Sequence, residues 1–178
     1  MGEFFKAIES RRSQRSYLDR AVDRGDLEKI VRAGDLAPLA GAISLTVITD
    51  RGFLADIDQA AFDFMQNSGV PFMVERSSLP GYRPLYGAPA LIVVGSDPER
   101  GTANAAAAAT AMTLAATDLG LGSCYVASPT RVLADGALKE RLGLPEGFAP
   151  LAGVLVGYTD EPLKFARDRA AAKTVWVD

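Results

Sequence analysis

Histidine is absent from the 178-residue chain, and cysteine occurs only once, as Cys124. Without histidine the chain cannot form a Ser-His-Asp or Cys-His catalytic centre or a metal site that needs an imidazole ligand. A single cysteine excludes an intrachain disulfide, a CxxC redox pair and a cysteine-ligated iron–sulfur cluster. Any chemistry must therefore use a cofactor, carboxylates, arginines, hydroxyls or the backbone.

Long apolar runs and an excess of positive charge are missing too. The most apolar run, residues 105–116, is too short to cross a bilayer, which takes about 20 residues, and the opening "MGEFFKAIES" lacks a signal-peptide core. The net charge of −3 and the pI of about 5.1 disfavour nucleic-acid binding. We expect a cytoplasmic protein that binds neither a membrane nor nucleic acid. Its mean hydropathy of +0.10 is slightly high, which indicates apolar surface buried against a partner.

The length fits one domain, residues 1–178, in which helices and strands alternate around a central sheet. Periodicity predicts helices at residues 4–8, 22–38, 53–65, 103–120 and 130–145. Apolar and β-branched runs predict strands at residues 42–49, 89–96, 123–128 and 150–158. The turn-rich stretch 67–89 is expected to be a long loop with some helix, and the tail 159–178 to be mostly extended.

Several helices carry more detailed expectations. Asp23 is expected to cap the second helix, and the third should turn Leu54, Ile57, Ala61 and Phe64 inward and leave Asp56, Asp58 and Asp63 in solvent. The alanine-rich helix 103–120 has almost no polar face, which predicts central burial, and Gly120 should end it. Gly136 should weaken the helix predicted at 130–145.

Three arginines surround a serine in "ESRRSQRSY", which contains Arg11, Arg12, Ser13 and Arg15. Guanidinium groups bind phosphate in a bidentate manner, so one interpretation is an anion site. The other is a solvated helix end, where arginines complement the helix dipole. Spacing alone leaves both open.

Other polar positions are equally ambiguous. Gly120 and Gly122 do not complete a dinucleotide fingerprint, because Tyr125 occupies its last glycine position and the glycines precede a strand. Cys124 is expected to be a buried structural thiol. Tyr82, Arg83 and Tyr86 either line a pocket or fix the long loop. These residues alone do not name a reaction.

The order of several segments resembles the nitroreductase family of FMN-dependent oxidoreductases. "RRSQRSYLDRAV" and "LEKIVRAGDLAP" are similar to its opening signature, "YGAPALIVV" to its central strand, and "AAAAATAMTLAATDLGLGSCYV" to its core helix and next strand. "PLAGVLVGY" and the basic tail with "VWV" resemble its closing segment. The resemblance implies an α+β fold with a mixed, mainly antiparallel sheet between helices, and an intertwined homodimer that binds two FMN molecules at its interface.

The resemblance also implies which residues bind FMN. Arg11, Arg12, Ser13 and Arg15 match the motif that binds the flavin's phosphate, ribityl chain and ring edge. The remaining implied positions are Pro38, Leu39 and Ala40 after the second helix, Arg83 at the pyrimidine edge, Tyr125, Val126, Ala127 and Ser128 at the N5 edge, and Lys164, Arg167 or Arg169 at the phosphate. Protein residues supply binding and electrostatics, because the flavin itself carries the redox chemistry.

One segment departs from the family pattern. Ala42 and Ser44 stand where the family usually has Asn and Gln, and Leu45 and Thr46 replace Pro-Trp. In the family this Asn ordinarily contacts the flavin, so its loss is expected to remove about 0.5–1.5 kcal/mol of FMN binding if no other group substitutes for it.

Two functions therefore compete. One is an FMN-dependent enzyme in which an NAD(P)H-type or other donor reduces the flavin and a nitroaromatic, quinone or similar small acceptor reoxidises it in ping-pong fashion. The other is a non-enzymatic flavin-binding or sequestering protein, or a family member poor in cofactor. Specialised family chemistry such as dehalogenation or flavin fragmentation is less favoured, because the chain shows no inserted lid segment.

Overall fold

A four-stranded antiparallel sheet runs through the middle of the computed structural model, which describes residues 2–134, 136–160, 170 and 172–177. The strands lie in the order β1-β2-β4-β3. Their bounds are β1 Ile43–Ile48, β2 Ala90–Ser96, β3 Gly122–Val126 and β4 Ala149–Gly157. β2 and β4 are central and almost wholly buried, which explains why their sequences are continuous apolar runs.

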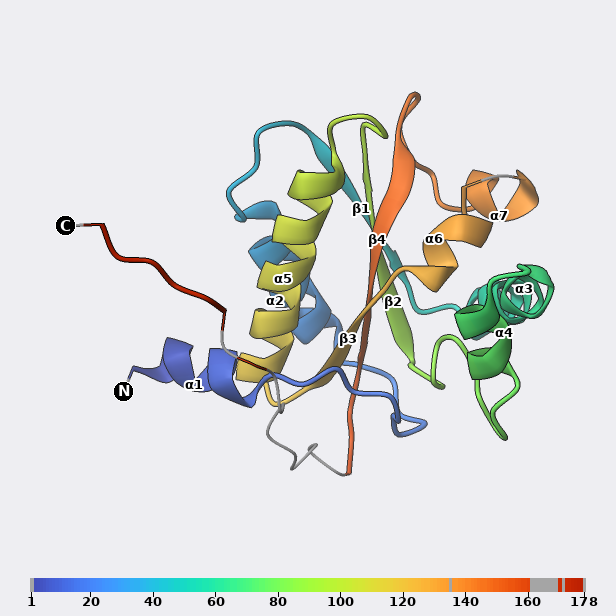
Figure 1. Ribbon diagram of the computed structural model, residues 1–178, viewed down its shortest axis with the longest axis horizontal. Coiled ribbons are helices and arrows are strands. Elements are labelled where there is room, and N and C mark those ends of the chain that lie inside the picture. The colour runs from blue at the N-terminus through green and yellow to red at the C-terminus, as the bar shows by residue number, and fades with distance from the viewer. Residues whose placement is uncertain (1, 135, 161–169, 171, 178) are drawn as a thin grey trace.

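Helices cover both faces of the sheet (Figure 1). One layer contains α2 Arg24–Asp35 and α5 Thr102–Asp118, with α1 Glu3–Ser10 beside the end of α5. The other contains α3 Arg51–Asn67, α4 Pro71–Ser77, α6 Ser128–Val132 and α7 Gly136–Glu140. The architecture is α+β, as predicted.

Each face of the sheet has its own apolar core. Ile30, Met112 and Val154 belong to the core under α2 and α5, whereas Ile57, Leu91 and Leu155 belong to the core under α3 and α6. All six of these side chains are fully buried. The strand alternation that sends Val154 to one face and Leu155 to the other therefore fills both cores.

The predicted helix starts and stops are largely confirmed. The Asp23 side chain accepts a hydrogen bond from the N–H of Gly25 (2.8 Å) and caps α2. Gly120 has φ of +73° just after the end of α5, the left-handed conformation that glycine adopts without strain. Asp50 caps α3 through the N–H of Phe53, so this helix begins two residues earlier than predicted.

Four expectations were wrong in detail. Phe64 is 39% exposed and Met65 is buried in its place, because helical rotation brings Met65 one turn beyond Ala61. Asp58 is buried rather than solvated. The strand predicted at 123–128 ends at Val126, and Ser128 starts α6. The helix predicted at 130–145 is divided into α6 and α7, because Gly136 takes a φ of +68°.

The alanine-rich helix α5 is buried on one face only. Ala105, Ala108, Ala109, Met112 and Ala116 lie in the core. The opposite face is also apolar but lines a surface groove. The prediction that this helix is centrally buried is therefore correct, within one chain, for one of its faces only.

Candidate functional site

The loop that follows α1 is attached along β3, which places the arginine motif beside the sheet. The N–H of Gln14 donates to the carbonyl of Ser123 (2.8 Å), and Ser13 forms an isolated parallel bridge with Ser123. Gly122 permits this close approach, since a Cβ atom there would lie 2.9 Å from Cγ of Gln14. The N–H of Leu18 then donates to the carbonyl of Tyr158 (2.9 Å), so the loop is fixed at both ends.

The arginines of this loop have different surroundings. Arg12 Nη1 donates to the carbonyls of Glu9 (2.6 Å) and Arg11 (2.9 Å), as in the helix-end interpretation. Arg15 is exposed, and its Nη1 donates only weakly to the carbonyl of Ser13 (3.3 Å). Within the described part of the chain no carboxylate pairs with Arg15. Arg15 is therefore available to bind an anion.

Cys124 lies beneath this loop and connects it to a second group of residues. Its side chain is buried and it has no disulfide partner, as predicted. Burial raises the pKa of the thiol, while a hydrogen bond from Ser13 and the charges of Arg15, Arg11 and Arg76 act to lower it. Arg76 belongs to α4, far from the loop in sequence. Positive charge from two separate segments thus acts on the thiol of Cys124.

Arg76 is held by two tyrosines of the long loop. Its Nη2 donates to the hydroxyl of Tyr86 (3.0 Å), and its guanidinium lies 5.2 Å from the ring centre of Tyr82. The two tyrosine rings meet edge to face at 5.8 Å. The hydrogen bond to Tyr86 raises the pKa of Arg76, so its positive charge is retained at any physiological pH.

Tyr17 is close both to the loop that carries Arg15 and to Tyr86, which holds Arg76. Its hydroxyl donates to the carbonyl of Gln14 (3.0 Å), and its ring packs against the core that contains Cys124, as does the ring of Tyr86. Burial raises the pKa of Tyr17 well above its ordinary value, with Cys124 and Tyr86 adding to the effect. We call the set the arginine site; it comprises Arg11, Ser13, Arg15, Tyr17, Arg76, Tyr86 and Cys124.

A cavity of about 420 Å³ opens beside the loop of the arginine site. Gln14, Arg15, Tyr17 and Thr159 are among its lining residues. The amide of Gln14 donates to the hydroxyl of Thr159 (2.6 Å), which joins the loop to the end of β4. The space is large enough, and its lining polar enough, to accept part of a charged small molecule.

Several other residues predicted to contact the flavin are not members of the arginine site. Arg83 Nε pairs with Asp58 (2.5 Å) and its other nitrogens contact Gln59, so Arg83 fixes the long loop to α3. Tyr125 is exposed on β3, Val126 is buried in the core, and Ala127 and Ser128 begin α6. Lys164, Arg167 and Arg169 lie outside the described residues. The contacts of all these residues with FMN stay predictions.

Pro38, Leu39 and Ala40 are separated from the arginine site within one chain. The N–H of Ala40 donates to Oδ1 of Asn104 (2.9 Å), in the first turn of α5. The arginine loop instead contacts β3, which begins after the far end of α5. α5 has 17 residues, which corresponds to about 25 Å of helix. The two groups therefore lie at opposite ends of α5.

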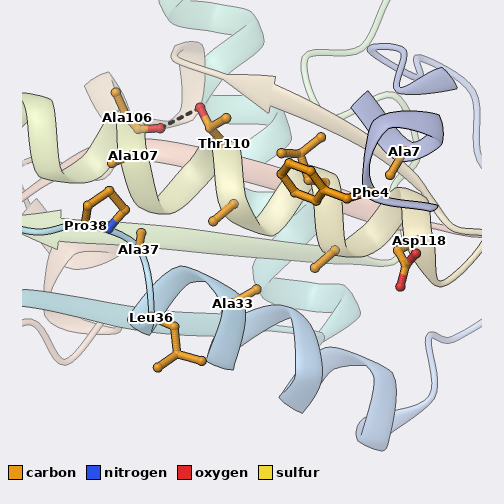
Figure 2. Close-up of a pocket in the computed structure, with 13 residues that line it drawn as sticks. Phe4, Ala7, Ala33, Leu36, Ala37, Pro38, Ala106, Ala107, Thr110 and Asp118 are labelled. Atoms are coloured by element: carbon orange, nitrogen blue, oxygen red, sulfur yellow. Dashed lines mark hydrogen bonds between the residues drawn. The ribbon is translucent and has the colours of Figure 1, made fainter. Parts of the chain in front are cut away.

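An apolar groove of about 930 Å³ runs along the outer face of α5 (Figure 2). Figure 2 shows Phe4 and Ala7 from α1, Ala33 from α2, Leu36 directly after α2, and Ala106, Ala107 and Thr110 from α5 around it. Phe4 is 64% exposed and Leu36 is 68% exposed. Side chains of this kind are seldom left in water as a continuous patch.

Sequence reasoning missed Arg76, Tyr17 and the role of Tyr86. Arg76 lies in a stretch predicted mainly as loop, and nothing in the spacing connects it to residues 11–15. Nothing in the local sequence indicates the backbone of Tyr86, because positive φ is typical of Gly, Asn and Asp rather than of a bulky residue. Tyr86 has φ of +53°.

Within the described residues, no helix has both the length and the apolar character needed to cross a membrane. No group of three or more acidic or cysteine side chains is arranged to hold a metal ion in the same part of the chain. The fold and the site together define an α+β protein with a cluster of arginines at a sheet edge and an apolar groove along α5.

Comparison with known proteins identifies the family. The model of the Nitroreductase family matches residues 8–158, and the chain therefore belongs to that family. A relative from Archaeoglobus fulgidus, named "Putative NADH dehydrogenase/NAD(P)H nitroreductase", is 34% identical over 175 residues, covering 93% of this chain and 90% of the relative.

Solved structures agree with the family assignment. The nitroreductase from Desulfitobacterium hafniense, crystallised with bound FMN, has a TM-score of 0.91 and 25% identity, with each chain covered completely. The nitroreductase from Bacteroides fragilis, also with bound FMN, has a TM-score of 0.85 and 26% identity at the same coverage. The predicted fold class and family are confirmed.

Proposed function

We propose that this protein is an FMN-dependent oxidoreductase that transfers electrons from a nicotinamide donor to a small acceptor such as a nitroaromatic or a quinone. The observation that supports this most directly is the arginine site, where Arg15 has no carboxylate partner among the described residues and lies beside Ser13 and Cys124. Family membership and the FMN-bound relatives point to the same cofactor.

The chemistry of the donor set fits FMN. A phosphate monoester carries a charge of about −1.5 to −2 near neutral pH and binds arginines through charge-assisted hydrogen bonds. Arg15 supplies an uncommitted guanidinium, and the hydroxyl of Ser13 lies on the same loop. Arg11 and Arg12 add positive charge near the end of α1. We infer that these four residues hold the phosphate and the ribityl chain.

Bound FMN would supply the redox chemistry, since its isoalloxazine ring accepts and donates hydride or electrons. The chain's own residues bind, orient and exclude water. The β3 backbone, which is fixed to the loop through Gln14 and Ser123, would help to hold and orient the flavin. Nearby guanidinium groups favour negative charge as it develops on reduction. No acid–base pair from the protein is required, which suits a chain without histidine.

We further propose that the working form is a homodimer. The groove on α5 is apolar and open, and Pro38 is one of its lining residues. Ala40, two residues after Pro38, is remote from the arginine site of its own chain. A second copy seated on the groove would cover Phe4 and Leu36 and bring its own Pro38–Ala40 segment toward a neighbouring flavin. The interface and the cofactor site would then be parts of one assembly.

The edge of the sheet supports the same proposal. β1 is an edge strand, and a groove of about 630 Å³ between it and α2 is lined by Leu27, Val31, Ile43 and Val47 among others. Residues 172–177 are exposed, with Trp176 84% exposed. An open strand edge readily pairs with another chain, and the apolar tail of a second copy is the occupant we propose.

The test is an absorbance titration of the purified protein with FMN, followed by anaerobic addition of NADPH and of NADH. Perturbed flavin bands that bleach on addition of a donor, and recover with a nitroaromatic or a quinone, are the expected result. Flavin that binds but stays oxidised with both donors would contradict the nicotinamide-dependent proposal. It would favour the sequestering function, for which the substitution of the usual Asn by Ala42 is the supporting observation. The cytoplasmic location stays a prediction.

A further inference from the structure

Arg76 is a half-buried cation without an anionic partner in the described part of the chain. Its guanidinium donates a hydrogen bond to the hydroxyl of Tyr86 (3.0 Å) and lies 5.2 Å from the centre of the ring of Tyr82. Other arginines with polar side-chain partners, such as Arg83 and Arg141, pair with carboxylates. A guanidinium has five N–H donors in a planar fork, so most of the binding capacity of Arg76 is unused.

Arg76 is held by a loop that contains a strained residue and is itself fixed to α3. Tyr86, its hydrogen-bond acceptor, is the one non-glycine residue with positive φ among the described residues. A bulky side chain seldom adopts this conformation, and residues strained in this way are concentrated at functional sites. Asp58 holds the same loop by accepting hydrogen bonds from Arg83 Nε and from the N–H of Leu85 (2.7 Å). The loop thus presents the Tyr86 hydroxyl to Arg76 in a fixed orientation.

Arg76 is linked to the rest of the arginine site through its hydrogen-bond acceptor Tyr86. Its charge acts on Cys124, as do the charges of Arg15 and Arg11 from the other segment. The ring of Tyr86 packs against the same core as Tyr17 and Cys124. Two segments that are distant in sequence therefore bring guanidinium groups without a carboxylate partner among the described residues, Arg15 and Arg76, to the surroundings of Cys124. The FMN phosphate is the ligand proposed for Arg15, and Arg76 offers a second group that can bind an anion.

We propose that Arg76 binds a carboxylate on the electron acceptor, so that the enzyme prefers aromatic acceptors that carry an acidic substituent. A planar guanidinium matches a carboxylate in a bidentate geometry, and the ring of Tyr82 beside it offers an aromatic face to the acceptor. Tyr86 is a positioning residue, because it acts by holding Arg76. This inference rests on the proposed oxidoreductase function.

The experiment compares para-nitrobenzoate with para-nitrobenzamide, a neutral acceptor of nearly the same shape. Dissociation constants for both are measured on the oxidised FMN-loaded protein by perturbation of the flavin spectrum, and kcat/KM for both with the nicotinamide donor. The variants are Arg76→Gln, Arg76→Lys and Tyr86→Phe. Arg100→Gln, an exposed arginine in the turn before α5, is the matched control.

We expect Arg76→Gln to weaken binding of para-nitrobenzoate by about tenfold to a hundredfold, the range for a lost charge-assisted hydrogen bond, with little change for para-nitrobenzamide. Arg76→Lys should recover part of the preference because it keeps the charge, and Tyr86→Phe should give a smaller loss of the same kind. Arg100→Gln should leave both acceptors unchanged.

Three results would overturn the inference. The wild-type protein could bind the two acceptors with equal affinity, or Arg76→Gln could lose affinity equally for both acceptors. The third result is a higher dissociation constant for FMN in Arg76→Gln. The last would mean that Arg76 contacts the flavin instead. If the wild-type protein turns over neither acceptor, the proposed reductase function fails, but the binding comparison still decides the role of Arg76.

Discussion

The carboxylate of Asp58 accepts a hydrogen bond from Arg83 Nε at 2.5 Å and, through its other oxygen, one from the backbone N–H of Leu85 at 2.7 Å. Asp58 projects from the inner face of α3, where it is 9% exposed. Arg83 also stacks over the ring of Phe62 at 5.3 Å. A single buried side chain therefore fixes the loop that carries Tyr86.

Replacing Asp58 by Ala should lower the free energy of unfolding by about 1–3 kcal/mol, because the N–H of Leu85 is left without an acceptor in a buried position. Urea denaturation of the flavin-free protein measures it. Asp63→Ala is the matched control, since Asp63 lies on the exposed face of the same helix. Equal losses in the two variants would contradict a special role for Asp58.

Asp58 also shows where sequence reasoning failed. Its spacing with Asp56 and Asp63 predicts a solvated face, and nothing local indicates an arginine 25 residues away. Strand positions, the caps at Asp23 and Gly120 and the two-sided sheet could be predicted, because they depend on nearest neighbours and on apolar periodicity. Contacts between remote segments, such as Arg76 with Tyr86 or Ala40 with Asn104, depend on the complete fold.

The candidate site was predictable to a similar extent. The motif around Arg15 is recognisable in sequence, but the different roles of its arginines are not: Arg12 folds back on α1, whereas Arg15 faces outward. Arg83 was the predicted cation of the long loop; the structure pairs it with Asp58, and its contact with FMN stays a prediction, whereas the charge of Arg76 acts on Cys124. The choice between these two arginines is made by tertiary packing.

Gly122 provides a test of how the arginine loop is held. Gly122→Ala should displace the loop, because the added Cβ would lie 2.9 Å from Cγ of Gln14. We expect a loss of about 1–3 kcal/mol in stability and weaker FMN binding, measured by denaturation and by flavin titration. Gly52→Ala in α3 is the control, since the nearest atom there lies at 3.4 Å. Unchanged FMN affinity in Gly122→Ala would show that the loop does not need this close approach.

Arg15 is the residue on which the cofactor proposal depends most. Arg15→Gln should raise the dissociation constant of FMN by about tenfold to a hundredfold, because a charge-assisted hydrogen bond to the phosphate is lost. Riboflavin, which lacks the phosphate, should bind the wild type and the variant equally. Arg20→Gln is the control, because the guanidinium of Arg20 lies over the ring of Tyr158 at 3.9 Å. A parallel loss with riboflavin would place Arg15 at another part of the flavin.

A substitution in the groove on α5 tests the proposed homodimer. Ala107→Glu places a carboxylate in the groove, where burial of an unpaired charge is costly. Sedimentation should show a dimer for the wild type and a monomer with reduced FMN retention for the variant. Ala137→Glu, on the exposed surface of α7, should remain dimeric. A wild-type monomer that retains FMN tightly would overturn the shared site.

The loop that holds Arg76 should also make stability depend on alkaline pH. Burial, followed by the neighbouring Tyr86, raises the pKa of Tyr82 from 10.0 to about 12. Between these values the folded protein keeps a proton that the unfolded chain releases, so the stabilising contribution is complete below about pH 10 and is lost as the pH rises toward about 12. Urea denaturation at intervals across this range should show a falling free energy of unfolding. Tyr82→Phe should flatten part of the decline. Tyr17, whose pKa is also raised by burial, accounts for the remaining decline in stability. An unchanged slope in the double variant Tyr17→Phe, Tyr82→Phe would contradict this assignment.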